Sequence, residues 1–184
     1  MPRPIEKGHI RPMSQSPGRP GTDEYAEFYA PYIAAVKEPL LDTLEAEAGE
    51  WGALLASVPP DREGYRYAPG KWSVREVVGH VTDAERMFTV RAMAFARGDR
   101  SHFPSFDENA YAANSGADGR TLADLAEEFT TVRRATVLLL RSFDEEVWSR
   151  RGVASGYEFT VRSLAWIIAG HSRHHRRVLA ERYL

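Results

Sequence analysis

Hydrophobic side chains recur along the chain in four long stretches, at the three- and four-residue spacing of amphipathic helices. Because this spacing places the apolar residues on one face of a helix, each stretch is expected to bury that face in a common core. The four patterns cover about residues 22–58, 73–98, 121–143 and 160–184. No segment alternates apolar and polar residues in the manner of a strand. The pattern therefore predicts an all-α protein built as a four-helix bundle.

The last three patterns each begin with residues that favour a helix N-terminus. Ser73 is followed three residues later by Glu76, which is the spacing of a capping box. In that motif each side chain accepts a hydrogen bond from a backbone N–H that the first turn of the helix leaves free. Thr121 and Thr160 are the N-cap residues expected for the third and fourth helices.

Composition divides the chain into a short N-terminal tail and one domain. Residues 1–21 contain five prolines and little that could pack in a core, so they are predicted to form a flexible tail. Residues 22–184 are enough for a single domain with its own core. Within the first helical pattern, Pro31 and Pro39 each remove a backbone N–H and crowd the preceding turn, which predicts a kink or a break.

The long segment between the second and third patterns bears on the order of the helices. Residues 99–120 show no convincing period, and connections this long in a compact domain are usually functional or topological. A bundle whose successive helices simply alternate in direction needs no such connection. An up-down-down-up bundle needs one long crossover between the second and third helices, which is where this segment lies.

Composition and charge exclude several other classes of protein. The 184 residues are 43% hydrophobic and 27% charged, close to the average of globular domains. The net charge of −2 gives no reason to expect nucleic-acid binding, and no apolar run approaches the ~20 residues needed to cross a membrane. The N-terminal residues lack the apolar stretch of a secretory signal, so a cytoplasmic location is expected. Without cysteine, the chain offers neither a thiolate nucleophile nor a disulfide framework.

Two histidines in the fourth pattern lie on the face that should point into the bundle. At about 100° per residue, His171 and His175 point within roughly 40° of each other, in the sector of the apolar residues. Histidines four residues apart on one helix face are a frequent way to bring two imidazoles to one metal ion. His174 lies at the edge of this face, roughly 60° from His171, and is the weaker candidate.

A third histidine, His80, lies on the apolar face of the second pattern, about 10 Å along the helix axis from Ser73. His175 lies at a similar distance from the other end of its own helix, near Tyr183. The histidines therefore come to one level only if the second and fourth helices are antiparallel, as they are in the up-down-down-up order. Because inward imidazoles are costly to bury unpaired, we predict a metal site formed by His80, His171 and His175.

Three histidine ligands would leave open coordination positions, which is typical of catalytic rather than structural metal sites. Nitrogen ligands alone suit Zn, Ni, Fe, Mn or Co, and the sequence does not choose among these metals. A metal with an open position can lower the pKa of bound water or hold a substrate thiol as its thiolate. The expected cofactor is therefore one divalent metal ion.

Three segments carry a resemblance to a known family. They are Tyr67–His80 (YAPGKWSVREVVGH), the stretch 83–99 with its Asp-Ala-Glu-Arg-Met-Phe and Arg-Ala-Met-Ala-Phe-Ala-Arg-Gly-Asp runs, and Ala169–His175 (AGHSRHH). Together they resemble the DinB-like family, in particular its branch of YfiT-type metal-dependent hydrolases. The resemblance covers about residues 22–184, which is everything except the tail.

The resemblance implies an up-down-down-up four-helix bundle with a three-histidine site for a divalent metal. It maps the first ligand to His80 and the pair to His171 and His175, and it implies a tendency to form homodimers. Some members of this family transfer low-molecular-weight thiols such as bacillithiol or mycothiol to electrophiles. Others isomerise thiol adducts, and many are named hydrolases without a known substrate. Membership therefore implies a metal more securely than it implies a reaction.

Arg91 and Asp83 are candidates for roles beside the metal. Arg91 shares a face with His80 about three turns further along, and an inward arginine should have an anionic partner. That partner is either a carboxylate of the chain, such as Glu128 or Asp83, or the carboxylate of a substrate. Asp83 either orients a ligand or metal-bound water, or forms a surface ion pair. Glu85 points away from the histidines and is expected to be a surface carboxylate or part of an ion pair.

Other residues could lie near the site. Trp72 is expected to pack over the end of the bundle, with a place in a pocket wall as the alternative. The crossover segment 101–111 could cover the site, and Arg182 could contact an anionic cosubstrate. The candidates in the crossover segment are His102, Asp107 and Tyr111.

Two hypotheses of different classes follow. In the first, the protein is an enzyme whose metal activates water or a small thiol, so that it acts as a hydrolase or a thiol transferase on a small molecule. Asp83 would serve the hydrolase, and Arg91 or Arg182 would bind the carboxylates of a thiol. In the second, the protein is a non-catalytic binding or stress-response bundle that a metal only stabilises. A third alternative is a plain bundle whose histidines pack together without a metal.

Overall fold

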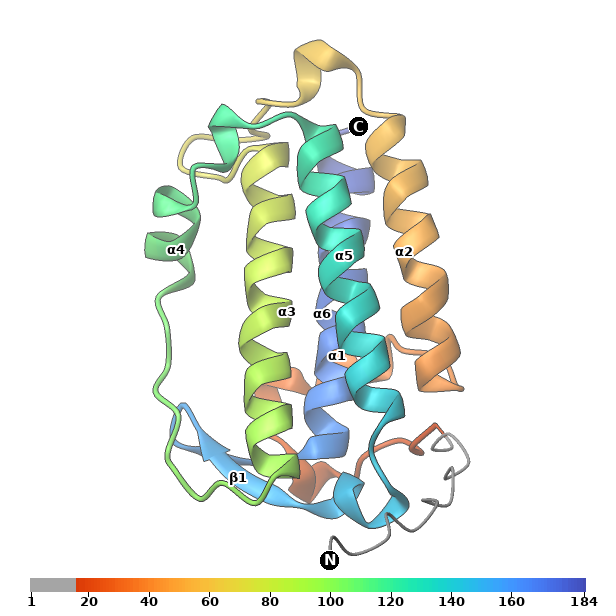
Figure 1. The fold of residues 1–184 in the computed structure, drawn as a ribbon. Coiled ribbons are helices and arrows are strands. Elements are labelled where there is room, and N and C mark those ends of the chain that lie inside the picture. The colour runs from red at the N-terminus through yellow and green to blue at the C-terminus, as the bar shows by residue number, and fades with distance from the viewer. Residues whose placement is uncertain (1–15) are drawn as a thin grey trace, which may run out of the picture.

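Four long helices form the body of the structure, a computed structural model that describes residues 16–184. Two of these helices run in one direction and two in the other (Figure 1). The predicted fold class and the predicted up-down-down-up order are both confirmed. In chain order the helices are α2 (Leu40–Ala56), α3 (Val74–Ala96), α5 (Leu122–Arg141) and α6 (Val161–Arg182).

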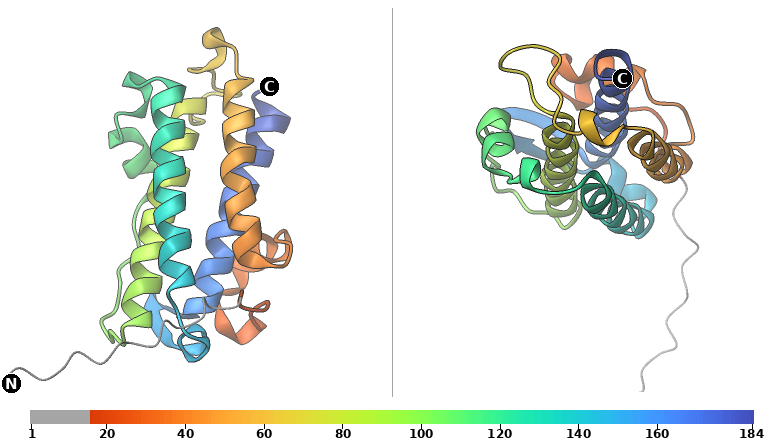
Figure 2. Two further views of the ribbon diagram at one scale, coloured as in Figure 1. Left: turned by 45° about the vertical axis from the view of Figure 1, so that its right-hand side comes forward. Right: turned by 90° about the horizontal axis from the view of Figure 1, so that it is seen from above.

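The four helices occupy the corners of a square in which α2 lies diagonally opposite α3, and α5 lies diagonally opposite α6. α3 packs against α5 and α6, and α2 packs against the same two helices from the opposite corner (Figure 2). The crossover from α3 to α5 climbs the outside of the bundle and contains the short helix α4 (Glu108–Asn114) (Figure 1). Because α3 and α6 are adjacent and antiparallel, the first turns of α3 lie beside the last turns of α6.

The predicted caps define the starts of α3 and α6. The Ser73 hydroxyl accepts a hydrogen bond from the Glu76 N–H at 3.0 Å, and the Glu76 carboxylate accepts one from the Ser73 N–H at 2.8 Å. Thr160 caps α6 in the same reciprocal way with Ser163. These bonds satisfy backbone donors that would otherwise be free, so the sequence sets where the two site-bearing helices begin.

The first helical pattern is divided at its prolines. Pro31 lies in the first turn of α1 (Ala30–Ala34), where the backbone N–H that proline lacks would have no hydrogen-bond partner within the helix. Pro39 ends the connection from α1, and α2 begins at Leu40. The prolines therefore produce a break rather than a kink, and α1 packs across α6 as a separate element.

A two-stranded hairpin corrects the expectation that the chain contains no strand. β1 (Arg151–Ala154) pairs antiparallel with β2 (Tyr157–Thr160), and Phe103 of the crossover adds an isolated bridge to Ala154. Ser155 and Gly156 form the connection, with φ of 54° and 82°. Strands of four residues are too short for a clear alternation of polar and apolar side chains, and Ser-Gly is a weaker turn signal than Asn-Gly or Asp-Gly.

The described end of the predicted tail lies against the bundle. Arg19 donates hydrogen bonds to the carbonyl oxygens of Ile33 at 2.7 Å and Val36 at 2.9 Å, and its guanidinium stacks on the Trp166 ring at 4.6 Å. This end of the predicted tail therefore contacts the domain through Arg19. The rest of the predicted tail, residues 1–15, lies outside the described residues.

A buried ion-pair network ties three helices together. Arg133 of α5 is 1% exposed and donates to both carboxylate oxygens of Glu85 on α3, at 2.8 to 3.0 Å. It also pairs with Glu47 of α2 at 3.0 Å. Glu85 indeed points away from the histidines and forms an ion pair, but it is buried rather than on the surface.

Gly170 sets how closely α1 approaches α6. A Cβ atom at this position would lie 2.2 Å from the backbone oxygen of Tyr32. We therefore expect Gly170→Ala to displace α1 and to lower the free energy of unfolding by about 1–3 kcal/mol, measured by urea titration. Gly52→Ala on α2 is the matched control, because nothing lies within 4 Å of its added Cβ. Equal stability of the two variants would contradict the expectation.

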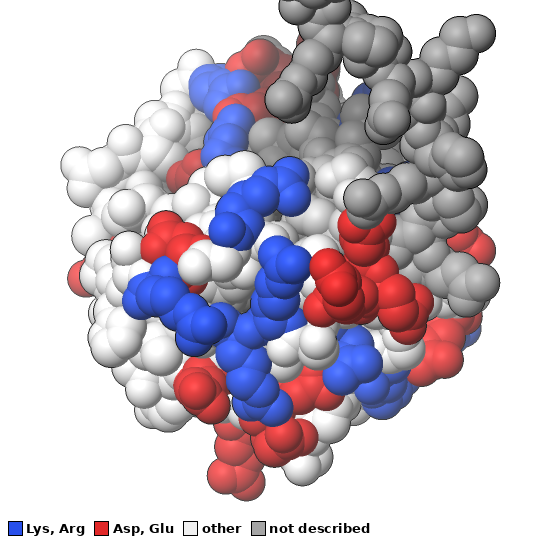
Figure 3. All heavy atoms as spheres, turned by 60° about the horizontal axis from the view of Figure 1, so that its bottom comes forward, with Lys and Arg blue, Asp and Glu red and all other residues white. Residues whose placement is uncertain are grey.

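No helix in the described part of the chain is long and apolar enough to cross a membrane. The end of the bundle near the hairpin carries basic and acidic side chains side by side (Figure 3). Arg151 pairs with Asp23 at 2.8 Å, and Arg162 pairs with Glu24 at 2.5 Å. Charge in this region is therefore distributed among local ion pairs.

Candidate metal centre

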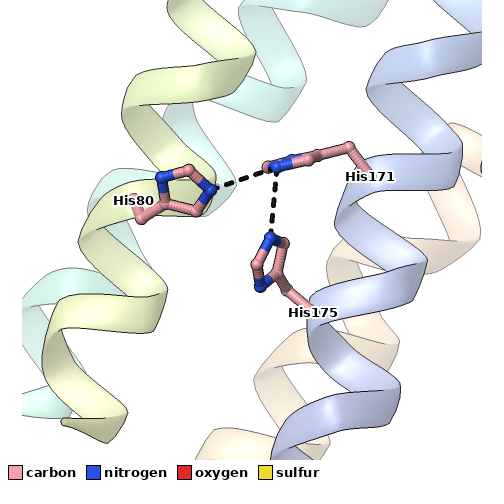
Figure 4. A group of neighbouring side chains, drawn as sticks. All are labelled: His80, His171 and His175. Carbon is pink, nitrogen blue, oxygen red and sulfur yellow. Dashed lines mark hydrogen bonds between the residues drawn. The ribbon is translucent and has the colours of Figure 1, made fainter. Parts of the chain in front are cut away.

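The structure brings His80, His171 and His175 together. The Nε2 atoms of His80 and His171 lie 3.1 Å apart, and those of His175 and His171 lie 3.2 Å apart (Figure 4). One ligand nitrogen from each of the three rings lies within 4.8 Å of the other two. His80 comes from α3 and the other two from α6, as the spacing and the helix order predicted.

The separations of these nitrogens suit a metal ion. Two nitrogens bound at 2.0–2.1 Å in tetrahedral geometry lie about 3.3 Å apart, close to both observed distances. A direct hydrogen bond explains the arrangement less well, because two rings approach the same Nε2 atom of His171. The donor set therefore fits one divalent ion, and its three nitrogens leave positions open for a further ligand.

The histidines are held in their neutral form. Burial lowers the pKa of His80 to about 4, and burial followed by the neighbouring His80 and His174 lowers that of His175 to about 3. The pKa of His171 is also lowered, first by burial and then by the other histidines. Neutral imidazole is the form that binds metals, so no proton has to leave these residues near neutral pH.

The three histidines line a cavity of about 550 Å³. This volume is in the range of sites that bind small organic molecules. Most of the other lining side chains are aromatic or apolar, with a few polar groups among them. They are Phe28, Tyr29, Tyr32, Trp72, Ala84, Phe88, Arg91, Ser105, Phe106, Glu108, Ser155 and His174.

Aromatic rings enclose the histidines. Trp72 stacks on His80 with ring centroids 4.4 Å apart, and Tyr32 meets His171 edge to face at 5.7 Å. Trp72 therefore lies in the pocket wall, which was the alternative to the expected packing over the end of the bundle. Tyr32 reaches this position because Gly170 allows α1 to approach α6.

Arg91 lies in the same pocket, and Asp83 does not. The Arg91 Nη2 atom donates to the Pro104 carbonyl oxygen at 2.7 Å, and among the described residues it has no carboxylate partner. The expected ion pair with Glu128 or Asp83 is therefore wrong, since both of these carboxylates pair with Arg86 instead. Asp83 is also not brought to the histidines, so it cannot orient them directly.

The crossover segment covers the pocket, but with other residues than those expected. Asp107 caps α4 by accepting hydrogen bonds from two backbone N–H groups, while His102 and Tyr111 are exposed and do not line the cavity. Arg182 is likewise exposed and does not line the cavity. The segment instead contributes Ser105, Phe106 and Glu108.

The cavity wall also contains His174 and three residues that were not predicted from the sequence. His174 lines the cavity but is not part of the group that could hold a metal. Glu108, Tyr32 and Ser155 were missed. Glu108 and Ser155 come from short elements outside the four helical patterns, where no periodicity points to a shared pocket. Tyr32 lies within the first pattern, but in the short helix α1, which is separate from the long helix α2.

An up-down-down-up bundle with three histidines converging in a pocket defines the class of protein: a four-helix bundle with a candidate metal centre. The family model of the DinB superfamily matches residues 43–179. The chain therefore belongs to the DinB superfamily, as the sequence resemblance implied.

One solved structure has a similar fold. The chain is similar to YfiT from Bacillus subtilis, described as "a probable metal-dependent hydrolase with an unusual four-helix bundle topology". The two share 17% sequence identity with a TM-score of 0.69, over 80% of this chain and 87% of that one. At this identity the likeness supports the fold alone. No curated protein matches the chain.

Proposed function

We propose that this protein is a divalent-metal-dependent enzyme that acts on a small molecule, with His80, His171 and His175 as the metal ligands. The observation that carries the proposal is the convergence of three neutral imidazole nitrogens inside a cavity of about 550 Å³. A site that serves only to stabilise a fold usually has four protein ligands and no adjoining cavity. Here three ligands adjoin a cavity with room for a substrate.

The protein residues define what such a site can do. A metal ion bound there would polarise water or a thiol and favour its deprotonated, nucleophilic form. Trp72 and Tyr32 shield the histidines from solvent, which strengthens electrostatic interactions in the site. Burial raises the pKa of Tyr32, so its hydroxyl stays neutral and can donate a hydrogen bond to a ligand.

The lining residues bear on whether water or a thiol is the nucleophile. Asp83, the base expected for a hydrolase, lies outside the pocket, and Glu108 is the only carboxylate among the lining residues. Arg91, a cationic group expected for a thiol transferase, lines the pocket. These two placements favour transfer of a small thiol over hydrolysis by water.

Metal content tests the proposal. We expect the untagged protein to bind about one divalent ion per chain, and His175→Ala to bind it about a hundredfold or more weakly, because a ligand is lost. Elemental analysis after dialysis against Zn²⁺, Ni²⁺ or Mn²⁺ measures this. His102→Ala is the matched control, since His102 is exposed and lies outside the cavity.

Two results would contradict the proposal. If no metal binds the wild-type protein, or if His102→Ala loses as much metal as His175→Ala, the three histidines do not form the site. If metal binds but neither small thiols nor electrophiles bind to the loaded protein, the metal stabilises a non-catalytic bundle.

A further inference from the structure

Arg91 is a buried cation that no carboxylate of residues 16–184 neutralises. Its side chain is 2% exposed, and its Nε atom is buried without a hydrogen-bond partner. Its Nη2 atom donates to the Pro104 carbonyl oxygen at 2.7 Å and lies 3.4 Å from the Ser155 hydroxyl. An arginine carries five N–H donors, so most of this guanidinium's hydrogen-bonding capacity is unused among the described residues.

The other deeply buried arginine of the domain shows what complete pairing looks like. Arg133 is 1% exposed and is held by the carboxylates of Glu85 and Glu47. A buried charge without a partner is strongly unfavourable. Arg91 is buried to nearly the same extent, but neither of its two protein partners, Pro104 and Ser155, carries a negative charge. The missing partner is therefore expected to come from outside the described residues.

The position of Arg91 indicates where that partner lies. Arg91 and the three histidines line the same cavity, and Ala84 and Phe88 lie between Arg91 and His80 along α3. The Phe106 ring faces the guanidinium at 6.0 Å. Ser155 reaches the cavity from the hairpin turn, where it adopts a φ of 54° that non-glycine residues rarely take. The cavity thus has a histidine end, an apolar middle and a cationic end.

We propose that Arg91, together with Ser155, binds a carboxylate of the substrate, so that substrates of this enzyme are carboxylic acids whose reacting group is separated from the carboxylate by an apolar spacer. This inference rests on the proposed function for the chemistry at the histidine end. A carboxylate fits better than a phosphate dianion, because one guanidinium neutralises one negative charge and the cavity wall already contains the carboxylate of Glu108.

The length of the spacer follows from helix geometry. The Cα atoms of His80 and Arg91 are separated by about 16 Å along α3, since eleven residues rise about 1.5 Å each. Side chains on a helix lean toward its N-terminus at both positions, so this offset is kept. A metal–nitrogen and a metal–sulfur bond of about 2 Å each at one end, and a hydrogen bond of about 3 Å at the other, leave roughly 9–10 Å for the ligand itself. A spacer of about five to seven methylene groups covers this distance.

A series of ω-mercaptoalkanoates, from mercaptopropionate to mercaptooctanoate, serves as the probe. Each is compared with the mercaptoalcohol of the same chain length on the Co²⁺-loaded protein. Isothermal titration calorimetry gives the affinity, and the thiolate–cobalt absorption band shows that sulfur binds the metal. We expect the carboxylate to bind about tenfold or more tightly than the alcohol at the lengths that span the pocket, with no preference for mercaptopropionate.

Variants of Arg91 separate its role from packing. Arg91→Met should remove the preference for the carboxylate and leave the affinity for the mercaptoalcohol unchanged. Arg91→Lys retains the charge without the planar fork and should keep part of the preference. The matched control is Arg97→Met at the end of α3, because Arg97 is exposed and lies outside the cavity. Thermal unfolding of each variant confirms that it is folded.

The outcomes distinguish this inference from the proposed function. Equal affinities for carboxylate and alcohol at every length, or a preference that survives Arg91→Met in the folded variant, would overturn the inference and leave the metal site intact. If Co²⁺ does not bind, the proposed function fails instead. In that case binding of hexanoate or octanoate to the metal-free protein, lost in Arg91→Met, would still support the anion site, and the absence of such binding would overturn it.

Discussion

Glu85→Gln is expected to lower the free energy of unfolding by about 3–5 kcal/mol, because it leaves the buried Arg133 guanidinium without its main counter-charge. The two charges meet through three hydrogen bonds between α3 and α5, and both side chains are almost fully buried. For a domain of this size the change corresponds to a melting temperature roughly 6–20 °C lower. Urea titration and thermal unfolding by circular dichroism measure it.

A surface pair provides the control for this expectation. Asp124→Asn removes one of the two carboxylate partners of Arg120, and the Asp124 side chain is 56% exposed, so the loss should stay below about 1 kcal/mol. Glu85→Gln combined with Arg133→Met should recover much of the stability, because no unpaired charge remains. A loss of less than about 1 kcal/mol for Glu85→Gln alone would mean that Glu47 and the backbone suffice to hold Arg133.

The long helices and the histidine cluster could be predicted because both depend on short-range regularities. Helical periodicity identifies the buried face, and a capping box such as that of Ser73 and Glu76 marks where a helix begins. The histidines followed from the same periodicity once helix order was known. The helix order was itself indicated by the long segment before Thr121, since the up-down-down-up bundle requires a long crossover there and a simple alternating bundle does not.

What could not be predicted depends on contacts between distant segments. The sequence around Arg91 does not show whether this arginine pairs with Glu128 or faces a pocket. The rotation of α3 relative to the crossover segment decides between the two. Glu85 was recognised as pointing away from the histidines, but its burial depends on Arg133, 48 residues further along. Trp72 lies outside the helical pattern, so periodicity gave no direction for its ring.

The hairpin of β1 and β2 also depends on contacts between distant segments, and it contributes to the pocket. Its strands are four residues each, and their pairing is completed by Phe103 from the crossover. A sequence pattern therefore had no way to place Ser155 beside Arg91. The residues that meet Arg91 at the polar end of the pocket come from the elements with the weakest sequence signals, whereas the histidine end is built entirely by helices with strong ones.

Saturating the site with Zn²⁺ is expected to stabilise the protein by about 4 kcal/mol at a free metal concentration about a thousand times Kd. This corresponds to a melting temperature roughly 8–16 °C higher than that of the chelated protein. The physical reason is that the folded chain presents three converging imidazoles, while the unfolded chain presents separate ones. Differential scanning calorimetry with and without metal measures the shift, which should disappear in His171→Ala.

The chelated variants separate metal binding from packing. Without metal, His171→Ala removes a neutral, buried ring that lies against two other imidazoles, so its cost should be that of a cavity, about 1–3 kcal/mol. With metal, the variant should lose this amount and also the whole stabilisation by Zn²⁺. His102→Ala should keep the full metal-dependent shift, because His102 lies outside the cavity. A shift of equal size in His171→Ala would mean that the metal stabilises the fold from another position, and the three histidines would then be a packed cluster rather than a metal centre.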